Sequence, residues 1–343
     1  MRKDNKIPYK CENTNDKIYE EIQKDMKKVN GKSNYAYVIT LFSIKKKAEM
    51  ADLKKYVAGA LNLAYVLKDI LKTKADLVAL VTPDVSNECR ILLKKFYKIK
   101  ICKRLKVDNK NVLENFALHN KGWHYVFTKI HAFNLLKYKK VVLLDIDISP
   151  IKYYDHLFTL STPAGIIELP WGNDESGKKY KKMKKKNSKQ HIWMEKYCKC
   201  CYNNKKIPKY ITKNVVSRNV PGINAGILVI KPNKKIYKDL MKQIDILKNI
   251  KKPLKHKYRL PEQQFLTQYF DQWYGADPRF GSHNGYPTMD KIFGIHHIFI
   301  YKPWNMKKND KTMYPSEKYW WKNYNKFLIK YKIKNTDLLK LGI

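Results

Sequence analysis

Long apolar runs alternate along this chain with segments of helical periodicity, and no other feature of the sequence constrains the fold as strongly. The apolar runs lack the polar alternation of half-exposed strands, which is typical of strands covered on both faces. Alternating strands and helices predict an α/β fold with a Rossmann-like, mixed but mainly parallel sheet flanked by helices. The strands are expected at residues 35–42, 75–82, 98–107 and 140–147, and the helices between them at 52–71, 85–97 and 126–138.

The second half of the chain resumes this pattern. A strand is expected at 223–232, and a helix at 261–274 has Pro261 in its first turn, where proline fits well. A late strand at 296–304 is expected to run into a loop. The aromatic tail from Tyr314 is expected to form a helix that packs on the domain.

Shifts in composition suggest the limits of the domain. Residues 1–33 are polar and predict an N-terminal extension, whereas 34–310 form one large domain and 311–343 a helical tail. A basic insertion covers 172–218, and its low-complexity part, 175–190, predicts a solvated loop.

Hydropathy and cysteine usage predict the compartment. Hydrophobic residues make up 44% of the 343 residues, which predicts a globular chain. No apolar run is long enough for a transmembrane helix, and the N-terminus lacks the apolar core of a secretory signal. Six scattered cysteines favour free thiols in a reducing compartment. We therefore expect a cytoplasmic protein, or one in the host cytoplasm or virion if the chain is viral.

The formal charge of +41 raises the question of a polyanionic partner. Only six of the 71 basic residues are Arg, the residue that base-reading proteins favour for its bidentate geometry. An excess of Lys, Asn, Ile and Tyr is also what an AT-rich coding sequence produces. Solvated surface lysines are therefore favoured, and a selected anionic partner is the alternative; a nucleic-acid partner is not expected.

Asp145 and Asp147 follow a predicted buried strand directly. Ligands of open α/β sheets bind beyond the carboxyl ends of the strands, and side chains at i and i+2 of an extended segment face the same way. Two carboxylates on one side need a compensating cation, and oxygen ligands suit Mg²⁺ or Mn²⁺. The alternative is an aspartate that caps a turn.

Two later segments add further polar groups. His296 would favour Mn²⁺ over Mg²⁺ as an imidazole beside carboxylates, and Lys302 would neutralise a diphosphate. Asn224–Gly226 place an amide and a backbone without side chain at a strand start, which suits the close approach of a polar ligand. The alternatives are a buried histidine, a surface lysine and a tight turn.

Taken together, these segments resemble glycosyltransferase family 8, the glycogenin and galactinol synthase group. The match covers roughly residues 35–305 and keeps the family's order of motifs. It consists of YVAGALNLAYVLK (56–68), FTKIHAFNLLKYKKVVLLDIDISPIKYYDHLF (127–158), INAGILVIKPN (223–233), EQQFLTQYF (262–270) and HHIFIYKPW (296–304). The resemblance implies a GT-A fold and a retaining transferase that uses a UDP-sugar and Mn²⁺, with Mg²⁺ as the alternative ion. UDP-glucose is favoured over UDP-galactose and UDP-N-acetylglucosamine.

The resemblance also implies roles for individual residues. Asp145, Asp147 and His296 would be the metal ligands. The catalytic candidates are Gln263, Glu262, Asn224 and Lys302. The donor would be bound by Thr40, Leu41, Tyr56, Lys129, Asp145, Ile146, Glu168, Asn224, Ala225, Gly226, Gln263 and Lys302. The acceptor would be a glycan, a polyol or a protein, and a second copy of the chain is a further candidate partner.

Some positions depart from the family pattern. Phe299 stands where the family has a glycine near the phosphates, and Thr267 where it has an asparagine. Cys198, Cys200 and Cys201 lie in the insertion, but a closed zinc site needs four ligands and no second pair is evident. Two alternatives to the enzyme therefore stay open: a degenerate donor-binding protein and a basic nucleic-acid-binding protein.

Overall fold

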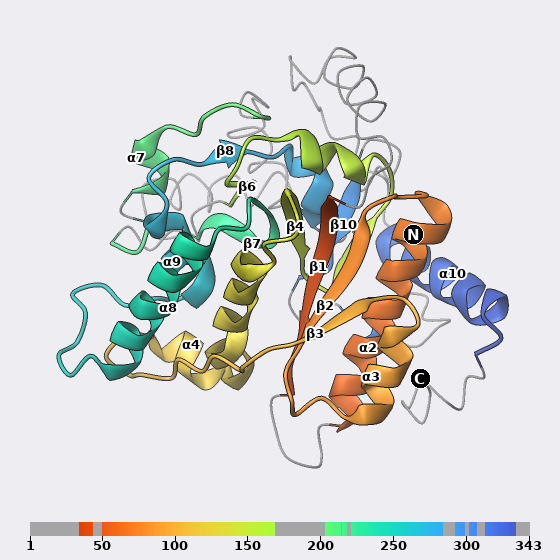
Figure 1. Ribbon diagram of the computed structural model, residues 1–343, viewed down its shortest axis with the longest axis horizontal. Helices are drawn as coiled ribbons and strands as arrows, with labels where there is room; N and C mark the ends of the chain where they lie inside the picture. Colours follow the sequence, from red (N-terminus) through yellow and green to blue (C-terminus); the bar gives the residue numbers. More distant parts are fainter. Residues whose placement is uncertain are drawn as a thin grey trace, which may run out of the picture.

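The centre of the molecule is a seven-stranded sheet with the strand order β3-β2-β1-β4-β7-β6-β8 (Figure 1). The computed structural model describes residues 34–43, 50–168, 203–213, 215–217, 221–283, 292–298, 302–306 and 313–333. The strands of the central sheet are β1 (Tyr35–Leu41), β2 (Asp76–Val81), β3 (Lys98–Ile101), β4 (Lys140–Leu144), β6 (Ala164–Glu168), β7 (Gly222–Ile230) and β8 (Tyr274–Gly275). A second, three-stranded sheet contains β5 (Ile148–Pro150), β10 (Gly294–His296) and β9 (Ser282–His283).

The central sheet is mixed and mainly parallel, as the sequence predicted. β1 pairs in parallel with β2 and β4, and β2 pairs in parallel with β3. β7 runs antiparallel to both β4 and β6. All residues of β7 are buried, which agrees with its continuous apolar sequence. Because β1 and β4 are parallel neighbours, their carboxyl ends lie at the same edge of the sheet.

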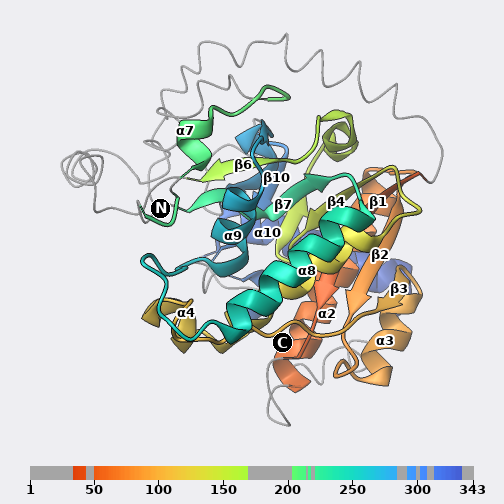
Figure 2. The ribbon, with the colours of Figure 1, turned by 60° about the vertical axis from the view of Figure 1, so that its left-hand side comes forward.

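Helices cover both faces of this sheet (Figures 1 and 2). The helical segments are α2 (Met50–Tyr65), η1 (Val66–Ile70), α3 (Asn87–Lys94), α4 (Asn115–His119), η2 (Lys121–Asn134), η3 (Tyr154–Thr159), α7 (Lys209–Thr212), α8 (Lys234–Asn249), α9 (Pro261–Tyr269), η4 (Pro278–Gly281), η6 (Pro303–Asn305) and α10 (Pro315–Lys330). One buried cluster joins the sheet to α2, α3 and α10, and another joins its opposite face to η2, α8 and α9. Of the helices in the described ranges, none is both long and apolar enough to cross a membrane.

The third strand is shorter than predicted. It ends at Ile101, because the chain then leaves the sheet edge and follows η2. Leu105 N–H donates to Thr128 Oγ1 (3.1 Å), and Val107 N–H donates to the carbonyl of His124 (2.8 Å). The helix predicted at 126–138 begins at Lys121 and is a 3₁₀ helix rather than an α-helix.

The late strand predicted at 296–304 was wrong in position. β10 ends at His296, where the prediction placed its beginning. The backbone turns directly afterwards, since Ile298 N–H donates to the carbonyl of His296 (3.0 Å), and Pro303 then opens η6. The helix predicted from Tyr314 is confirmed as α10, and the helix predicted at 261–274 ends at Tyr269.

Several predicted features lie outside the described residues. They are the extension 1–33, most of the insertion 172–218 with Cys198, Cys200 and Cys201, and Phe299.

Candidate functional site

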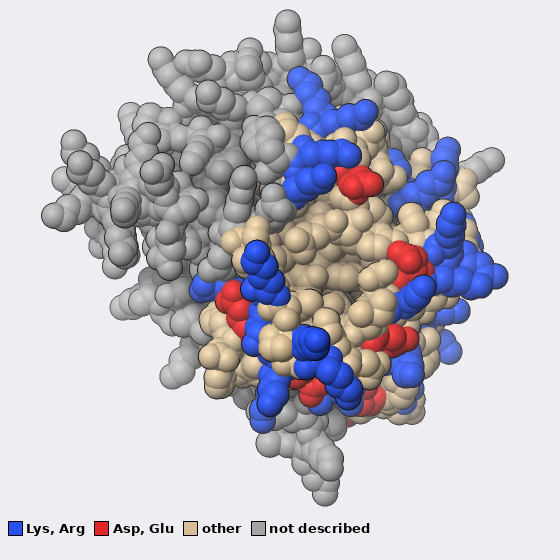
Figure 3. Space-filling view, turned by 90° about the vertical axis from the view of Figure 1, so that its left-hand side faces the viewer, with Lys and Arg blue, Asp and Glu red and all other residues tan. Residues whose placement is uncertain are grey.

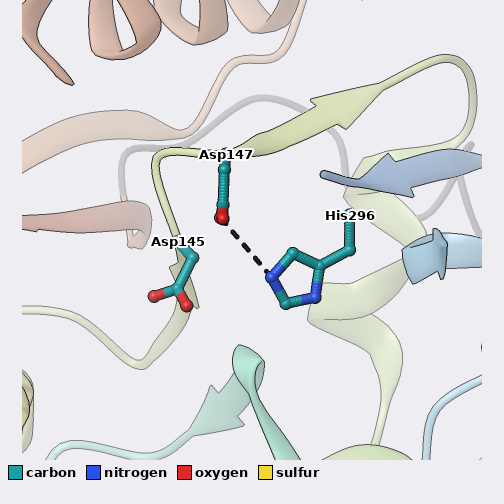
Figure 4. A group of neighbouring side chains, drawn as sticks. All are labelled: Asp145, Asp147 and His296. Carbon is teal, nitrogen blue, oxygen red and sulfur yellow. Dashed lines mark ion pairs between the residues drawn. The ribbon is translucent and has the colours of Figure 1, made fainter. Parts of the chain in front are cut away.

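Asp145, Asp147 and His296 converge at the carboxyl end of β4 (Figure 4). Each residue offers one ligand atom, and these atoms all lie within 4.8 Å of one another. Asp145 N–H donates to the carbonyl of Gly226 (2.9 Å), and Ile148 N–H donates to the carbonyl of Asp145 (3.1 Å). A tight turn therefore brings both carboxylates to one side. His296 arrives from the other sheet, where it pairs with Ile148.

The carboxylate of Asp147 is held between two basic groups. Its Oδ1 lies 3.4 Å from His296 Nε2, and its Oδ2 forms an ion pair with Lys302 Nζ. Burial alone would raise the pKa of Asp147, but the charges of Lys302 and His296 outweigh it and lower that pKa. The carboxylate is therefore ionised at neutral pH, as a metal ligand must be.

The surroundings of Asp147 also fit a metal ion. Its Oδ1 is buried and has no hydrogen-bond partner among the residues that the structure describes. Two carboxylates with one imidazole are a donor set that suits Mn²⁺. Gly226 leaves the space for this arrangement, since a Cβ at this position would lie 2.5 Å from His296 Cε1.

A buried lysine joins Asp145 to helix α9. Lys129 Nζ lies 2.7 Å from Asp145 Oδ1 and 2.9 Å from Glu262 Oε1, and it donates to the carbonyl of Ala225 (3.3 Å). Burial would lower the pKa of Lys129, but the two carboxylates outweigh it and raise that pKa. Lys129 is thus a fixed positive charge beside the metal-ligand candidates.

The amides of α9 and β7 hold the strand that borders this site. Gln263 Oε1 accepts from Ala225 N–H (3.1 Å), and Gln263 Nε2 donates to the carbonyl of Pro221 (3.1 Å). Asn224 Oδ1 accepts from Gly226 N–H (2.7 Å).

Thr267 Oγ1 accepts from the N–H of Ile223 (2.9 Å). The threonine that replaces the expected asparagine therefore fixes the backbone of β7.

The remaining donor-binding candidates lie at nearby strand ends and on α2. Thr40 and Leu41 end β1, and Thr40 Oγ1 is buried with no hydrogen-bond partner in the described part of the chain. Tyr56 is 36% exposed, and its ring packs edge-on against Trp304, at 5.4 Å between ring centres. Ile146 lies in the turn between the two aspartates. Glu168 ends β6, and its side chain is outside the described residues.

The structure also brings in residues and contacts that the sequence did not predict. The resemblance to the family implied that Lys129 binds the donor and that Glu262 lies near the sugar, and the structure joins the two in one ion-pair chain with Asp145. His297 is fully buried beside the candidate metal ligand His296. Two adjacent histidines in the sequence could have indicated this, because neighbours in an extended segment point to opposite sides and only one of them can face the metal site.

The chain matches known proteins over most of its length. The family model "Glycosyl transferase family 8" matches residues 33–308. An uncharacterized protein of Acanthamoeba polyphaga mimivirus is 32% identical over 295 residues, which are 83% of this chain and 88% of that protein. Galactinol synthase 6 of Arabidopsis thaliana is 26% identical over 309 residues, which are 82% of this chain and 81% of the synthase.

A solved structure shares the fold. The crystal structure of an active-site mutant of LgtC aligns with a TM-score of 0.50 at 12% identity. The alignment covers 86% of this chain and 95% of the LgtC chain.

Proposed function

The chain belongs to glycosyl transferase family 8 and is a glycosyltransferase with a GT-A fold, and we propose that it is a retaining enzyme that moves a hexose from a UDP-sugar to a hydroxyl acceptor with the help of Mn²⁺. The observation that carries the proposal is the convergence of Asp145, Asp147 and His296 beside Lys129 and Lys302. UDP-glucose is the favoured donor. A polyol acceptor agrees with the galactinol synthases among the relatives.

Asp145, Asp147 and His296 would hold the metal ion. Mn²⁺ is preferred to Mg²⁺, because an imidazole among the ligands suits the softer ion. When bound, the ion would neutralise charge on the diphosphate of the leaving UDP. Asp147 is buried, so the field of the site is screened little by solvent.

The two lysines have different roles in this proposal. Lys302 would bind the diphosphate and leave its present partner, the Asp147 carboxylate, to the metal ion. Lys129 is held by Asp145 and Glu262, so it would act as a fixed charge beside the donor phosphate or sugar. Both ammonium groups would stabilise the negative charge that develops on UDP as the glycosidic bond breaks.

We propose same-face attack of the acceptor hydroxyl, guided by the departing phosphate. Retention through a covalent intermediate would need a free carboxylate below the anomeric carbon. Glu262 is the acid that the resemblance to the family would put near the sugar, and Lys129 already engages it. Glu262, Gln263 and Asn224 would then steady the sugar while the anomeric carbon gains positive character.

The test is hydrolysis of a panel of UDP-sugars with and without Mn²⁺, in the wild type and in Asp147→Asn. We expect metal-dependent hydrolysis of one preferred donor, and a loss of at least about 100-fold in the variant, because outer-shell changes alone often cost 10- to 100-fold. Asp155→Asn is a matched control, since Asp155 is bonded to Tyr37 and Thr73 instead of the site. Undiminished hydrolysis without Mn²⁺ would contradict the proposal. Binding of UDP without any turnover would indicate a degenerate donor-binding protein instead.

A further inference from the structure

His297 is a buried histidine whose imidazole contacts two separate parts of the fold. A hydrogen bond of 2.9 Å joins its Nε2 to Ser149 Oγ in β5. Its Nδ1 faces Glu317 Oε1, in the first turn of α10, at 3.7 Å. That distance is too long for a hydrogen bond, and this nitrogen has no hydrogen-bond partner among the described residues. The side chains of His297 and Glu317 are both fully buried, so neither contact is screened by bulk water.

The backbone of the same residue contacts the two groups that the proposed reaction needs most. His297 N–H donates to the carbonyl of Asp147 (3.0 Å). The carbonyl of His297 accepts from Lys302 Nζ, the ammonium that also pairs with the Asp147 carboxylate. One peptide segment therefore joins the candidate metal ligand to the candidate diphosphate ligand.

Ser149 makes this arrangement a link between two strands. β5 and β10 pair through only three positions, with Ile148 opposite His296. Ser149 follows Asp147 by two residues, and His297 follows His296 directly. The side-chain bond from Ser149 to His297 therefore closes the end of the ladder beside Asp147 and His296.

Glu317 connects this link to the C-terminal helix. It accepts the N–H of Tyr314 (2.8 Å) and the hydroxyl of Ser316 (3.0 Å), which fixes its carboxylate at the start of α10. Trp321 of the same helix donates from Nε1 to the carbonyl of Pro303 (3.1 Å), next to Lys302. α10 thus contacts both His297 and Pro303, the residue after Lys302.

We propose that His297 is a positioning residue: held by its hydrogen bond to Ser149 and packed beside Glu317, it fixes the separation of Asp147 and Lys302, so that α10 forms part of the support of the active site. The inference rests on the proposed metal and diphosphate roles of those two residues. If His297 lost its hydrogen bond to Ser149, its backbone contacts to Asp147 and Lys302 would be less fixed, and binding of the metal ion and the diphosphate would weaken together.

The experiment compares His297→Phe, His297→Gln and Ser149→Ala in the full chain. Phenylalanine fills a similar volume without polar atoms, whereas the glutamine amide can reach the position of Nε2 and restore the bond to Ser149. His156→Phe is the matched control, because His156 is a buried histidine that stacks on Phe280. Calorimetry gives the Kd of Mn²⁺ and of UDP with Mn²⁺, and a donor hydrolysis assay gives kcat and KM.

We expect His297→Phe to weaken binding of Mn²⁺ and of UDP about 10-fold each and to lower kcat, as loss of an outer-shell partner usually does. Ser149→Ala should produce the same pattern to a smaller degree, and His297→Gln should recover most of the wild-type binding. His156→Phe should lower the thermal midpoint and leave both Kd values unchanged.

Two negative results separate this inference from the proposed function. If the wild-type chain binds neither Mn²⁺ nor UDP, the proposed function fails, and the inference fails with it. If the wild type binds both, and His297→Phe and Ser149→Ala bind them equally well, only the positioning role is overturned. A His297→Phe chain that does not fold leaves Ser149→Ala to decide, since that variant removes a single hydroxyl.

Discussion

Gly226 shows how one backbone position controls the candidate metal site. A Cβ there would lie 2.5 Å from His296 Cε1 and 2.8 Å from Asn224 Oδ1, closer than real Cβ contacts allow. Gly226→Ala should therefore displace His296 and weaken Mn²⁺ binding about 10-fold or more, with the sheet intact. Calorimetric titration of Mn²⁺ into the variant measures the effect.

Gly165→Ala is the control for that variant. Gly165 lies in β6, and its added Cβ would meet Ile223 Cγ2 at 2.4 Å, so the steric conflict is just as severe. Because that contact involves an apolar side chain, we expect a loss of stability without a change in the Kd of Mn²⁺. Equal Mn²⁺ affinity of Gly226→Ala and the wild type would show that His296 is not held as the geometry indicates.

Asp155 is a half-buried carboxylate outside the candidate site, and its protonation is expected to make the stability of the fold depend on pH. Burial raises the pKa of Asp155 from its ordinary value of 3.8, although hydrogen bonds from Thr73 and Tyr37 counteract it. The folded state therefore binds this proton more tightly than the unfolded state does. The contribution of Asp155 to stability is fully present below pH 3.8 and is lost as pH rises through the folded-state pKa.

Asp155→Asn should remove this pH dependence. Thr73 and Tyr37 both donate to Oδ1, an atom that asparagine keeps. We expect the free energy of unfolding of the wild type, minus that of the variant, to fall as pH rises from about 4 to 7. Urea denaturation across that range measures it. A difference that stays constant with pH would mean that the pKa of Asp155 is not raised by folding.

At the scale of elements, α10 buries a continuous row of aromatic rings. Phe327 is fully buried and packs edge-on against Phe96, with ring centres 5.4 Å apart. Trp320 of the same helix packs against Trp304, at 5.9 Å, and Trp304 fills the space beside Gly59. The helix therefore stabilises both the domain and the loop that carries Lys302.

Phe327→Ala should lower the free energy of unfolding by about 3–5 kcal/mol, because it opens a cavity in this row of rings. Ile329→Ala is the matched change on the exposed side of α10, where the side chain is 78% exposed, and it should alter stability by at most about 0.5 kcal/mol. Chemical denaturation of both variants gives the values. Similar losses in the two variants would mean that α10 does not pack as described.

The elements that the sequence predicted best are those with local signals. Apolar runs located β1, β2, β4 and β7, and the aromatic, basic composition of the tail from Tyr314 indicated α10. The errors have non-local causes. β3 ends at Ile101 because later residues bond to η2, and β10 ends at His296 because the chain turns toward Asp147. A short stretch of sequence reveals neither the bonds to η2 nor the bond to Asp147, because the partners are distant along the chain.

The candidate site likewise contains residues that the sequence predicted and contacts that it did not. The resemblance to a family placed Asp145, Asp147 and His296 in one site, and the structure brings them together. Spacing alone could not do so, because His296 reaches the turn through a second, three-stranded sheet. The contact between Lys129 and Glu262 depends on the packing of η2 against α9 and was not predicted.

For the whole molecule, the net charge of +41 is the remaining feature to explain. On the face shown in Figure 3, Lys and Arg side chains form separate groups with Asp and Glu among them, around a hollow of uncharged residues. Such a surface attracts polyanions through its net charge, but the described residues form no continuous basic stripe on this face. Only six of the basic residues are Arg, which gives few bidentate contacts to bases.

We therefore expect DNA binding that is weak, non-specific and strongly dependent on salt. A lysine-rich surface that neutralises several phosphates should lose about 10³-fold or more in affinity between 50 and 200 mM salt, since binding releases counterions. Fluorescence anisotropy with a labelled duplex measures this, and a parallel titration of UDP with Mn²⁺ shows whether DNA competes. The proposed UDP site is lined by buried ion pairs, so its affinity for UDP should change far less over the same range of salt. Tight DNA binding that persists at 200 mM salt and displaces UDP would instead favour the nucleic-acid alternative.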